Sequence, residues 1–397
     1  MRDPTSFLRQ EYEELVRNDL DWKLRELQGP STPWCMVDGK RMLMFCSNNY
    51  LSLSNHPRVK EAAIEAIRTH GAGSGSVRPI AGTMDLHLEL ERRLAKFKGA
   101  EASLVYQTGF AANAGLIPQL VGKGDLIISD ELNHGSIIDG VRLSSAERAI
   151  FKHADVADLK MKLEEAEKKS APPRRILIIT DGVFSMDGDI APLPEIARAA
   201  REHGAMLYVD DAHGEGVLGE GGRGIVSHFK MPRDLVHVEM GTFSKAFGVV
   251  GGHISGSRDL INFALNRSRT WLLSGSHPPA VVAACIAAID VLEKEPEHVM
   301  RLWENTRYFK NAMTSLGFDI GKSETPITPI MVGESSLAKR MSEGLMREGV
   351  FALPIIFPMV ARDKARIRTI MNAALERKDV DFAIAAFEKV GRELKIL

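Results

Sequence analysis

A lysine set among small residues is the first feature of this sequence that points to chemistry. Lys245 stands within residues 241–248, Gly-Thr-Phe-Ser-Lys-Ala-Phe-Gly, directly after an apolar stretch that is predicted to be a buried strand. Burial lowers the pKa of a lysine, and imine formation with a carbonyl compound requires the neutral amine. The hydroxyls of Thr242 and Ser244 are suited to bind a phosphate or a ring. Judged alone, a Ser-Lys pair is usually a surface feature.

Two carboxylates follow another apolar stretch, in residues 209–214, Val-Asp-Asp-Ala-His-Gly. An isolated Asp-Asp pair is usually part of a solvated loop or a helix cap. Here Asp210 ends a predicted core strand and His213 follows three residues later, which favours a carboxylate that faces a ligand. An aspartate about 4 Å from a cationic ring nitrogen contributes about 4 kcal/mol at an effective dielectric of about 20, enough to keep a pyridinium protonated at neutral pH.

Two strand–helix junctions are suited to bind the rest of such a ligand. Gly109 allows a tight turn, and free N–H groups at the start of the following helix form an anion site. A plain connecting loop explains that segment about equally well. His134 stands at another predicted helix start, where a histidine is more often a cap or a packing residue. Its flat ring is nevertheless suited to stack on an aromatic cofactor.

Two further patterns are less specific. Residues 180–189 hold several acidic residues and glycines, but the spacing lacks the final Glu of an EF-hand, so we predict no metal site there. Arg366 and Arg368 alternate along a predicted strand and therefore share one face. A strand-borne arginine that faces a cleft is a bidentate clamp for a carboxylate, although a surface location is the more common one.

Short apolar runs that alternate with helical segments predict how these residues are positioned. The runs are continuous, as in a parallel sheet covered by helices on both faces, so we expect an α/β, doubly wound fold. Open parallel sheets bind ligands beyond the carboxyl ends of their strands, where the polar, glycine-rich segments fall. The predicted strands are 103–106, 126–129, 176–180, 206–209 and 237–240.

The two ends of the chain differ from its middle part in their sequence pattern. Residues 5–27 are predicted to form an amphipathic helix, with apolar side chains at helical spacing from Phe7 to Leu20. After a long helix that ends near residue 293, strands at 326–332 and 364–371 predict a smaller α+β domain. We therefore expect an N-terminal segment over 1–48, a major domain over 49–294 and a small C-terminal domain over 295–397.

The composition is that of an ordinary globular protein of 397 residues, 44% of them hydrophobic and 26% charged. The formal net charge of −1 argues against nucleic acid as a partner, and no apolar run approaches the roughly 20 residues that span a bilayer. No signal peptide is evident, and Cys35, Cys46 and Cys285 lack metal or disulfide spacing, so we expect a cytoplasmic protein. A nucleotide-binding module is disfavoured because no GxGxxG or P-loop follows the first strands.

Taken together and in this order, the motifs resemble those of the α-oxoamine synthases, which are fold-type I enzymes dependent on pyridoxal 5′-phosphate (PLP). The resemblance spans roughly residues 40–375 and is closest to the subgroup with glycine C-acetyltransferase (2-amino-3-ketobutyrate CoA ligase) and 8-amino-7-oxononanoate synthase, with serine palmitoyltransferase as a related third. The motifs are SNNYL (47–51), GSGS (73–76), GTMDLHLELE (82–91), TGF (108–110), NHGSIIDG (133–140), DGVFSMDGD (181–189), VDDAHG (209–214), GTFSKA (241–246) and ARIR (365–368).

The resemblance implies a role for each residue at a matching position. For the PLP ring, the implied roles are covalent attachment to Lys245, pairing of the pyridine nitrogen with Asp210, a hydrogen bond with His213, stacking on His134 and a contact with Ser185. The implied phosphate ligands are Thr108, Gly109, Phe110 and Thr242, and the amino-acid carboxylate is assigned to Asn48 and Arg368. The family completes its site across a dimer interface, so Ser274 and Ser276 are expected to reach the partner's phosphate in a homodimer. The residues expected to be catalytic are Lys245, His134, Asp210 and His213.

Three departures from the family pattern leave the cofactor residues untouched and concern specificity. Ser52 stands where a glycine usually follows Asn-Tyr-Leu. Thr270 and Trp271 stand in a segment that usually reads Arg-Pro-aromatic-Leu-Phe, and Leu375-Glu376 stand where His-Thr is common.

The implied reaction is the condensation of an acyl-CoA with a small amino acid, glycine first, which releases CoA and forms a 2-amino-3-oxo product with or without decarboxylation. Alanine with a pimeloyl thioester, as in 8-amino-7-oxononanoate synthase, and a serine palmitoyltransferase-like reaction stay open. A plain aminotransferase is disfavoured by the combination of NHGSIID, VDDAHG and DGVFSMDGD. A partner subunit without cofactor is disfavoured by the retained Lys245, Asp210 and His134.

Overall fold

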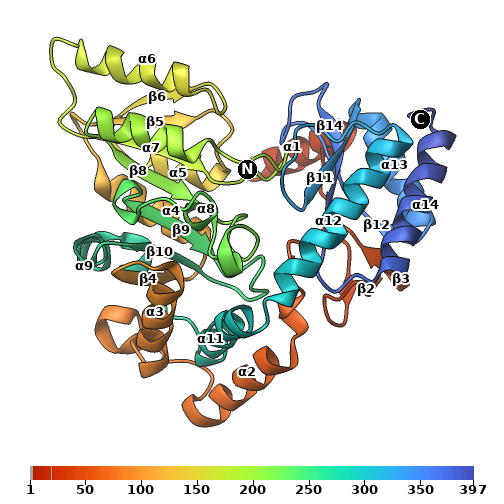
Figure 1. Ribbon diagram of the computed structural model, residues 1–397, viewed down its shortest axis with the longest axis horizontal. Helices are drawn as coiled ribbons and strands as arrows, with labels where there is room; N and C mark the ends of the chain where they lie inside the picture. The colour runs from red at the N-terminus through yellow and green to blue at the C-terminus, as the bar shows by residue number, and fades with distance from the viewer. Residues whose placement is uncertain (1–2, 19) are drawn as a thin grey trace.

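The fold centres on a seven-stranded sheet in the computed structural model, which describes residues 3–18 and 20–397 (Figure 1). The strand order is β4-β10-β9-β8-β7-β5-β6. Strands β9, β8, β7, β5 and β6 are parallel, and β10 is antiparallel to both of its neighbours. The prediction of an α/β fold with a mostly parallel sheet is therefore confirmed. The strands are β4 (Ala102–Tyr106), β5 (Leu126–Asp130), β6 (Glu147–Phe151), β7 (Ile176–Asp181), β8 (Met206–Asp210), β9 (Val238–Thr242) and β10 (Gly252–Gly256).

Two of these strands were not predicted from the sequence. β6 is an edge strand with mostly polar or exposed side chains, and β10 contains one large aliphatic residue, Ile254, between small or polar ones. Gly252 has a steric role, because a Cβ atom there would lie 2.3 Å from the carbonyl carbon of Thr108. The backbone of β10 can therefore approach the loop after β4 only because residue 252 has no side chain.

Both faces of the sheet are buried, because alternate residues of the same strands belong to different hydrophobic clusters. One cluster includes Ile127, Leu177 and Tyr208, and the other includes their neighbours Ile128, Ile178 and Val209. Two-sided burial explains why the strands are continuous apolar runs. The covering helices are α4 (Gly109–Leu120), α5 (Gly135–Arg142) and α9 (Arg258–Arg267) on one face, and α3 (Asp85–Lys98), α6 (Val156–Glu167), α7 (Leu193–Glu202) and α11 (Pro279–Lys294) on the other.

A smaller group of elements lies beyond α11, and α12 (Glu297–Leu316) runs from α11 to it (Figure 1). Its sheet has the order β11-β14-β13, and a second sheet has the order β1-β2-β3-β12. Strand β12 pairs with β3, so the second sheet joins N-terminal strands to a C-terminal one. The domain boundaries after residues 48 and 294 stay predictions. The elements are β1 (Leu27–Gln28), β2 (Trp34–Val37), β3 (Lys40–Met44), β11 (Ile327–Gly333), β12 (Val350–Phe351), β13 (Pro354–Ile355), β14 (Ala365–Ile370), α13 (Ser335–Arg347) and α14 (Arg377–Glu393).

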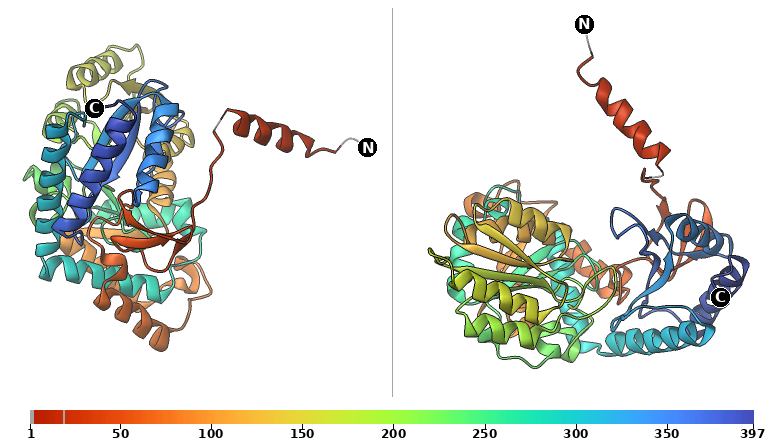
Figure 2. Two further views of the ribbon diagram at one scale, coloured as in Figure 1. Left: turned by 90° about the vertical axis from the view of Figure 1, so that its right-hand side faces the viewer. Right: turned by 90° about the horizontal axis from the view of Figure 1, so that it is seen from above.

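The N-terminal helix is shorter than predicted. Helix α1 spans Ser6–Arg17 rather than residues 5–27, with Asn18 as its C-cap, and residue 19 lies outside the described residues. Its apolar side chains are exposed and it projects away from the rest of the protein (Figure 2). The side chains of α1 are all exposed, so packing does not stabilise a helix that continues past Arg17. No helix in the described part of the chain is long and apolar enough to cross a membrane.

A buried ionic cluster joins α3 to the loop after β8 and to strand β9. Lys98 Nζ lies 2.6 Å from Glu239, 3.0 Å from Glu215 and 3.6 Å from Asp211, and all four side chains are essentially inaccessible to solvent. Burial alone would lower the pKa of Lys98, but these three carboxylates raise it above its ordinary value. The lysine is therefore a fixed cation that neutralises acidic groups from two elements, and no pattern in the sequence indicated this cluster.

We predict that Lys98→Met lowers the stability of the fold by about 3–5 kcal/mol, because it leaves carboxylates buried without their cation. The measurement is the urea midpoint of the holoenzyme, followed by far-UV circular dichroism. Lys168→Met is the control, since Lys168 pairs with Glu164 on the surface, and it should leave the midpoint unchanged. Equal midpoints for the two variants would contradict the role given to Lys98.

Candidate active site

Most of the residues predicted to bind the cofactor line one cavity at the carboxyl ends of the parallel strands. The cavity has an empty volume of ≈ 390 Å³. The residues in it that were expected from the sequence are Gly109, His134, Ser185, Asp210, His213, Thr242 and Lys245, and the others are Ser136, Asp181, Val183, Ala212 and Met240. The parallel topology brings them together, because the loops after β7, β8 and β9 leave the same edge of the sheet.

Asp210 is held in one orientation by neighbours on both of its carboxylate oxygens. Asn113 Nδ2 donates to Oδ2 at 2.8 Å and the backbone N–H of Ala212 donates to Oδ1 at 3.1 Å. Asn113 lies fully buried in α4 and accepts a hydrogen bond from the Tyr208 hydroxyl at 2.7 Å. The carboxylate can therefore turn neither toward nor away from the cavity without breaking a buried hydrogen bond.

A second carboxyl group lies beside Asp210. Asp181 ends β7, and the strand register places it directly opposite Asp210 on β8. Burial and then the charge of Asp210 raise the pKa of Asp181 well above its ordinary value. Asp181 also accepts the backbone N–H of His134 at 2.9 Å, so it positions the start of α5.

His134 caps α5 and presents a neutral ring to the cavity. The backbone N–H of Ser136 donates to His134 Nδ1 at 3.2 Å, so Nδ1 is an acceptor and the proton of the neutral ring is on Nε2. Burial lowers the pKa of His134; Asp210 opposes this shift and Lys245 adds to it. His134 is thus a helix cap that also lines the cavity, and its stacking on an aromatic cofactor stays a prediction.

Lys245 is unlike the other buried lysine of the chain. Burial lowers the pKa of Lys245, although Asp210 and Asp181 oppose the shift. Among the described residues the Nζ atom of Lys245 has no hydrogen-bond or ion-pair partner, whereas Lys98 has three carboxylates around it. Lys245 therefore presents a reactive amine, while Lys98 is a structural cation.

His213 is a neutral ring held through one nitrogen. The Tyr50 hydroxyl lies 2.8 Å from His213 Nδ1, and burial raises the pKa of Tyr50, so the phenol keeps its proton. Burial, with Lys245 and Arg368 nearby, holds the pKa of His213 well below its ordinary value. The ring is therefore neutral, and Tyr50 leaves its Nε2 nitrogen free.

The two strand arginines have different surroundings, although both start from one face of β14. Arg366 is buried and forms an ion pair with Asp187, and it also donates to the Met186 carbonyl at 3.0 Å. Arg368 donates to the Ser185 carbonyl at 3.1 Å, and no carboxylate among the described residues pairs with it. Arg366 thus holds the loop after β7, and Arg368 keeps donors available for a ligand.

The other predicted site residues lie around the cavity rather than in its lining. The Thr108 hydroxyl accepts the Ala111 N–H as the N-cap of α4, and Phe110 is half-exposed. Asn48 Oδ1 is buried without a hydrogen-bond partner. Ser274 is half-buried, and Ser276 Oγ lies 2.6 Å from Ser74 Oγ of the same chain, so no described contact brings either serine to the cavity.

The loop that carries Ser185 is secured by a residue that the sequence analysis did not select. His153 lies after β6, with Nδ1 3.2 Å from Asp130 and Nε2 2.7 Å from Asp189. Burial opposes protonation, but hydrogen bonds with Asp130 and Asp189 raise the pKa of His153 to about 10. The acidic residues that faintly suggested a calcium loop are thus partly neutralised by a histidine cation.

The three departures from the family pattern have local structural explanations. Ser52 has φ 60°, a left-handed conformation that glycine adopts with less strain. Trp271 is buried and the Thr270 hydroxyl donates to the Ala111 carbonyl in α4 at 2.6 Å. Leu375 is buried, and Glu376 is the N-cap of α14.

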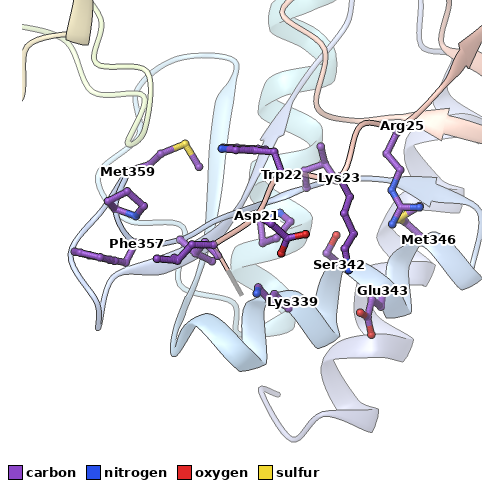
Figure 3. Close-up of a pocket in the computed structure, with 15 residues that line it drawn as sticks. Asp21, Trp22, Lys23, Arg25, Lys339, Ser342, Glu343, Met346, Phe357 and Met359 are labelled. Atoms are coloured by element: carbon purple, nitrogen blue, oxygen red, sulfur yellow. The ribbon is translucent and has the colours of Figure 1, made fainter. Parts of the chain in front are cut away.

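A larger cavity lies elsewhere, with an empty volume of ≈ 1090 Å³ (Figure 3). Residues 20–25 form one wall, and α13 with residues 353–359 forms the other. It contains none of the residues that line the smaller cavity, and its wall mixes Lys23 and Arg25 with Asp21 and Glu343 (Figure 3). Titratable groups with shifted pKa values lie in the smaller cavity, so they indicate the active site there although the other cavity is larger.

Comparisons with known proteins show the family to which the chain belongs. The model of the family "Aminotransferase class I and II" matches residues 40–387. An 8-amino-7-oxononanoate synthase from Symbiobacterium thermophilum is 55% identical over 393 residues, 99% of each chain. The serine palmitoyltransferase structure from Sphingomonas wittichii has a TM-score of 0.93 at 30% identity, and one from S. paucimobilis with bound PLP has 0.92 at 29%, with 100% of each chain covered in both cases. The chain belongs to the α-oxoamine synthases, the PLP-dependent branch of this family that joins an acyl thioester to an amino acid.

The residues of the cavity fit PLP group by group. A buried amine without a partner, Lys245, matches the aldehyde, and a fixed carboxylate, Asp210, matches a cationic pyridine nitrogen. His213 Nε2, the nitrogen that Tyr50 leaves free, matches the ring hydroxyl oxygen. The first N–H groups of α4, at Gly109 and Phe110, have no acceptor within the helix and match the phosphate.

Proposed function

We propose that this chain condenses alanine with a pimeloyl thioester, forming 8-amino-7-oxononanoate and releasing CO₂ and the thiol. The 55% identity with an 8-amino-7-oxononanoate synthase over 99% of both chains carries the proposal. The product's name fixes the carbon count. A nine-carbon chain with its amino group on carbon 8 and its oxo group on carbon 7 is a seven-carbon acyl group joined to alanine without its carboxylate.

Glycine with a shorter acyl-CoA, which the motifs favoured first, is the same chemistry with a different pair of substrates. The cavity residues named above do not distinguish between the two pairs of substrates, because they are the ones proposed to hold the cofactor and the reacting carbon. The choice therefore has to be made by assay rather than by the cofactor geometry.

The residues around the cavity support a division of labour toward PLP and the amino acid. PLP, when bound, supplies an electron sink for negative charge at the α-carbon of the amino acid. Asp210 would hold the pyridine nitrogen in its protonated form, and Asn113 keeps that carboxylate in place. His134 and Thr242 would hold the ring face and the phosphate side, and His213 would donate from Nε2 to the ring oxygen.

Lys245 and Arg368 would act on the amino acid itself. Because its pKa is lowered by burial, the Lys245 Nζ atom spends more time as a free amine and is suited to accept the proton of the α-carbon. Arg368 would hold the carboxylate with two parallel hydrogen bonds, and the side-chain amide N–H of Asn48 would donate a further one.

The proposal is tested by a thiol-release assay that combines acetyl-, pimeloyl- and long-chain acyl-CoA with glycine, alanine and serine. We expect pimeloyl-CoA with alanine to exceed every other pair in kcat/KM by about tenfold or more, with one CO₂ released per thiol. A preference for glycine and acetyl-CoA would move the chain to the second candidate. Amino transfer to an α-keto acid without thiol release would contradict both.

Arg368 gives a prediction for amino-acid binding. We expect Arg368→Lys to raise the KM for the amino acid by about 10–100-fold, because charge-assisted hydrogen bonds are worth about 1.5–3 kcal/mol and lysine cannot reproduce the fork. PLP retention and the KM for the acyl thioester should change little. Arg366→Lys is the matched control, since Arg366 is already paired with Asp187, and it should have the smaller effect on this KM. The reverse order would move the clamp to Arg366, and no change in either variant would remove β14 from the site.

We also propose that the enzyme is a cytoplasmic homodimer. The three cysteines are unpaired, as expected in a reducing compartment. The apolar side chains of α1 are exposed, and in the following segment Trp22 is 75% and Leu24 96% exposed. A second copy would cover these side chains, in keeping with the shared site that the resemblance implies.

The dimer is tested by analytical ultracentrifugation at the concentrations used for assay. The wild-type chain is expected to sediment as a dimer. Leu8→Glu combined with Leu15→Glu on α1 should weaken it, whereas Leu143→Glu, at another exposed leucine, should not. An active wild-type monomer would contradict the proposal.

A further inference from the structure

A second group of potential ligands lies outside the active site. His56, Glu295 and His298 bring one ligand atom each to within 4.8 Å of one another. No sequence pattern indicated this group, because residue 56 is far along the chain from residues 295 and 298 and the spacing of the latter two is that of an ordinary helix start. The three side chains are partly buried, with 16%, 25% and 14% of the side chain exposed, so an ion could reach them.

The distances match those of a tetrahedral metal site. Glu295 Oε2 lies 3.4 Å from His56 Nε2 and 3.2 Å from His298 Nε2. With metal–ligand bonds of about 2.0–2.1 Å, two ligands of tetrahedral Zn²⁺ are about 3.3 Å apart. Two imidazoles and one carboxylate are also a ligand set that Zn²⁺ takes in proteins, with water in the fourth position.

His56 has few hydrogen-bond partners among the described residues. Its Nδ1 atom is buried without a hydrogen-bond partner, and its Nε2 atom has only the 3.4 Å contact with Glu295. A neutral imidazole that binds a metal through Nε2 would carry its proton on Nδ1. A competing charge is Arg58, whose Nη1 atom lies 2.8 Å from Glu295 Oε1, the carboxylate oxygen that does not contact the histidines.

The three residues lie where the ends of three helices meet. His56 is the N-cap of α2 (Pro57–His70), Glu295 is the C-cap of α11, and His298 lies in the first turn of α12. Helix α12 is the element that leads from the large sheet to the smaller group of elements (Figure 1). Just before His56, the backbone of Ser54 packs against Gly248, where a Cβ atom would lie 2.3 Å from Ser54 N, and the Gly248 N–H donates to the Lys245 carbonyl at 2.9 Å.

We propose that His56, Glu295 and His298 bind a divalent transition-metal ion of the Zn²⁺ type, which clamps the junction of α2, α11 and α12. The ion would fix the angle at which α12 leaves α11 and the loop that packs against the Lys245 turn. It takes no part in the chemistry of the active site.

The test uses chelator-treated holoenzyme titrated with Co²⁺, whose visible d–d absorption reports a tetrahedral site and is measured as a difference spectrum. We expect saturable binding of one ion per chain, displaced by Zn²⁺, and a rise in the melting temperature with Zn²⁺. His298→Ala and Glu295→Gln should weaken Co²⁺ binding by at least about tenfold, since even the loss of outer partners costs about 10–100-fold. PLP absorbance and circular dichroism show that the variants remain folded.

Two control variants separate a metal site from a plain ion-pair cluster. His203→Ala removes a histidine that pairs with one carboxylate, Glu167, and has no third ligand, so it should leave Co²⁺ binding unchanged. Arg58→Ala removes the competing cation and should tighten Co²⁺ binding. Absence of a tetrahedral Co²⁺ spectrum, a spectrum that persists in both ligand variants, or weaker binding in Arg58→Ala would each overturn the proposal.

Discussion

The burial of Asp210 in the cavity that Lys245 also lines is the constraint on which the rest of the site depends. A carboxylate at the end of a core strand is costly unless each oxygen has a donor, and Asn113 and the Ala212 N–H supply them. The Lys245 amine receives no such partner from the described residues, and its pKa is lowered by burial. The protein thus fixes the acid and leaves the amine unpaired, which is the asymmetry that a covalently held cationic cofactor requires.

The surrounding architecture keeps this asymmetry in place. Lys98 balances Asp211, Glu215 and Glu239 directly behind the loop that carries Asp210, so the many acidic groups of this region do not compete for Lys245. Arg366 and His153 hold the loop after β7 through Asp187 and Asp189. Each cation that could neutralise the cavity has a carboxylate of its own, apart from Arg368, which is proposed to bind the substrate's carboxylate.

The sequence predicted the strands that carry chemistry because they are apolar runs followed by glycine and polar residues. It did not predict β10, whose glycines are needed for close backbone approach, or the end of α1, where no packing partner sustains the helix. Asp181 lay within the motif DGVFSMDGD and Asn113 follows TGF by three residues, but neither received a role, because their functions come from cross-strand register and from helix packing. The Lys98 cluster joins residues more than a hundred positions apart, and no local pattern can indicate it.

The central claim is that Lys245, and not the other buried lysine, holds the cofactor. The most direct measurement is borohydride reduction of the holoenzyme, followed by proteolysis and mass-spectrometric mapping of the pyridoxyl-labelled peptide. The account predicts a single adduct at Lys245, because its amine is buried, unpartnered and of lowered pKa. An adduct at Lys98, or at any lysine outside the cavity, would contradict it.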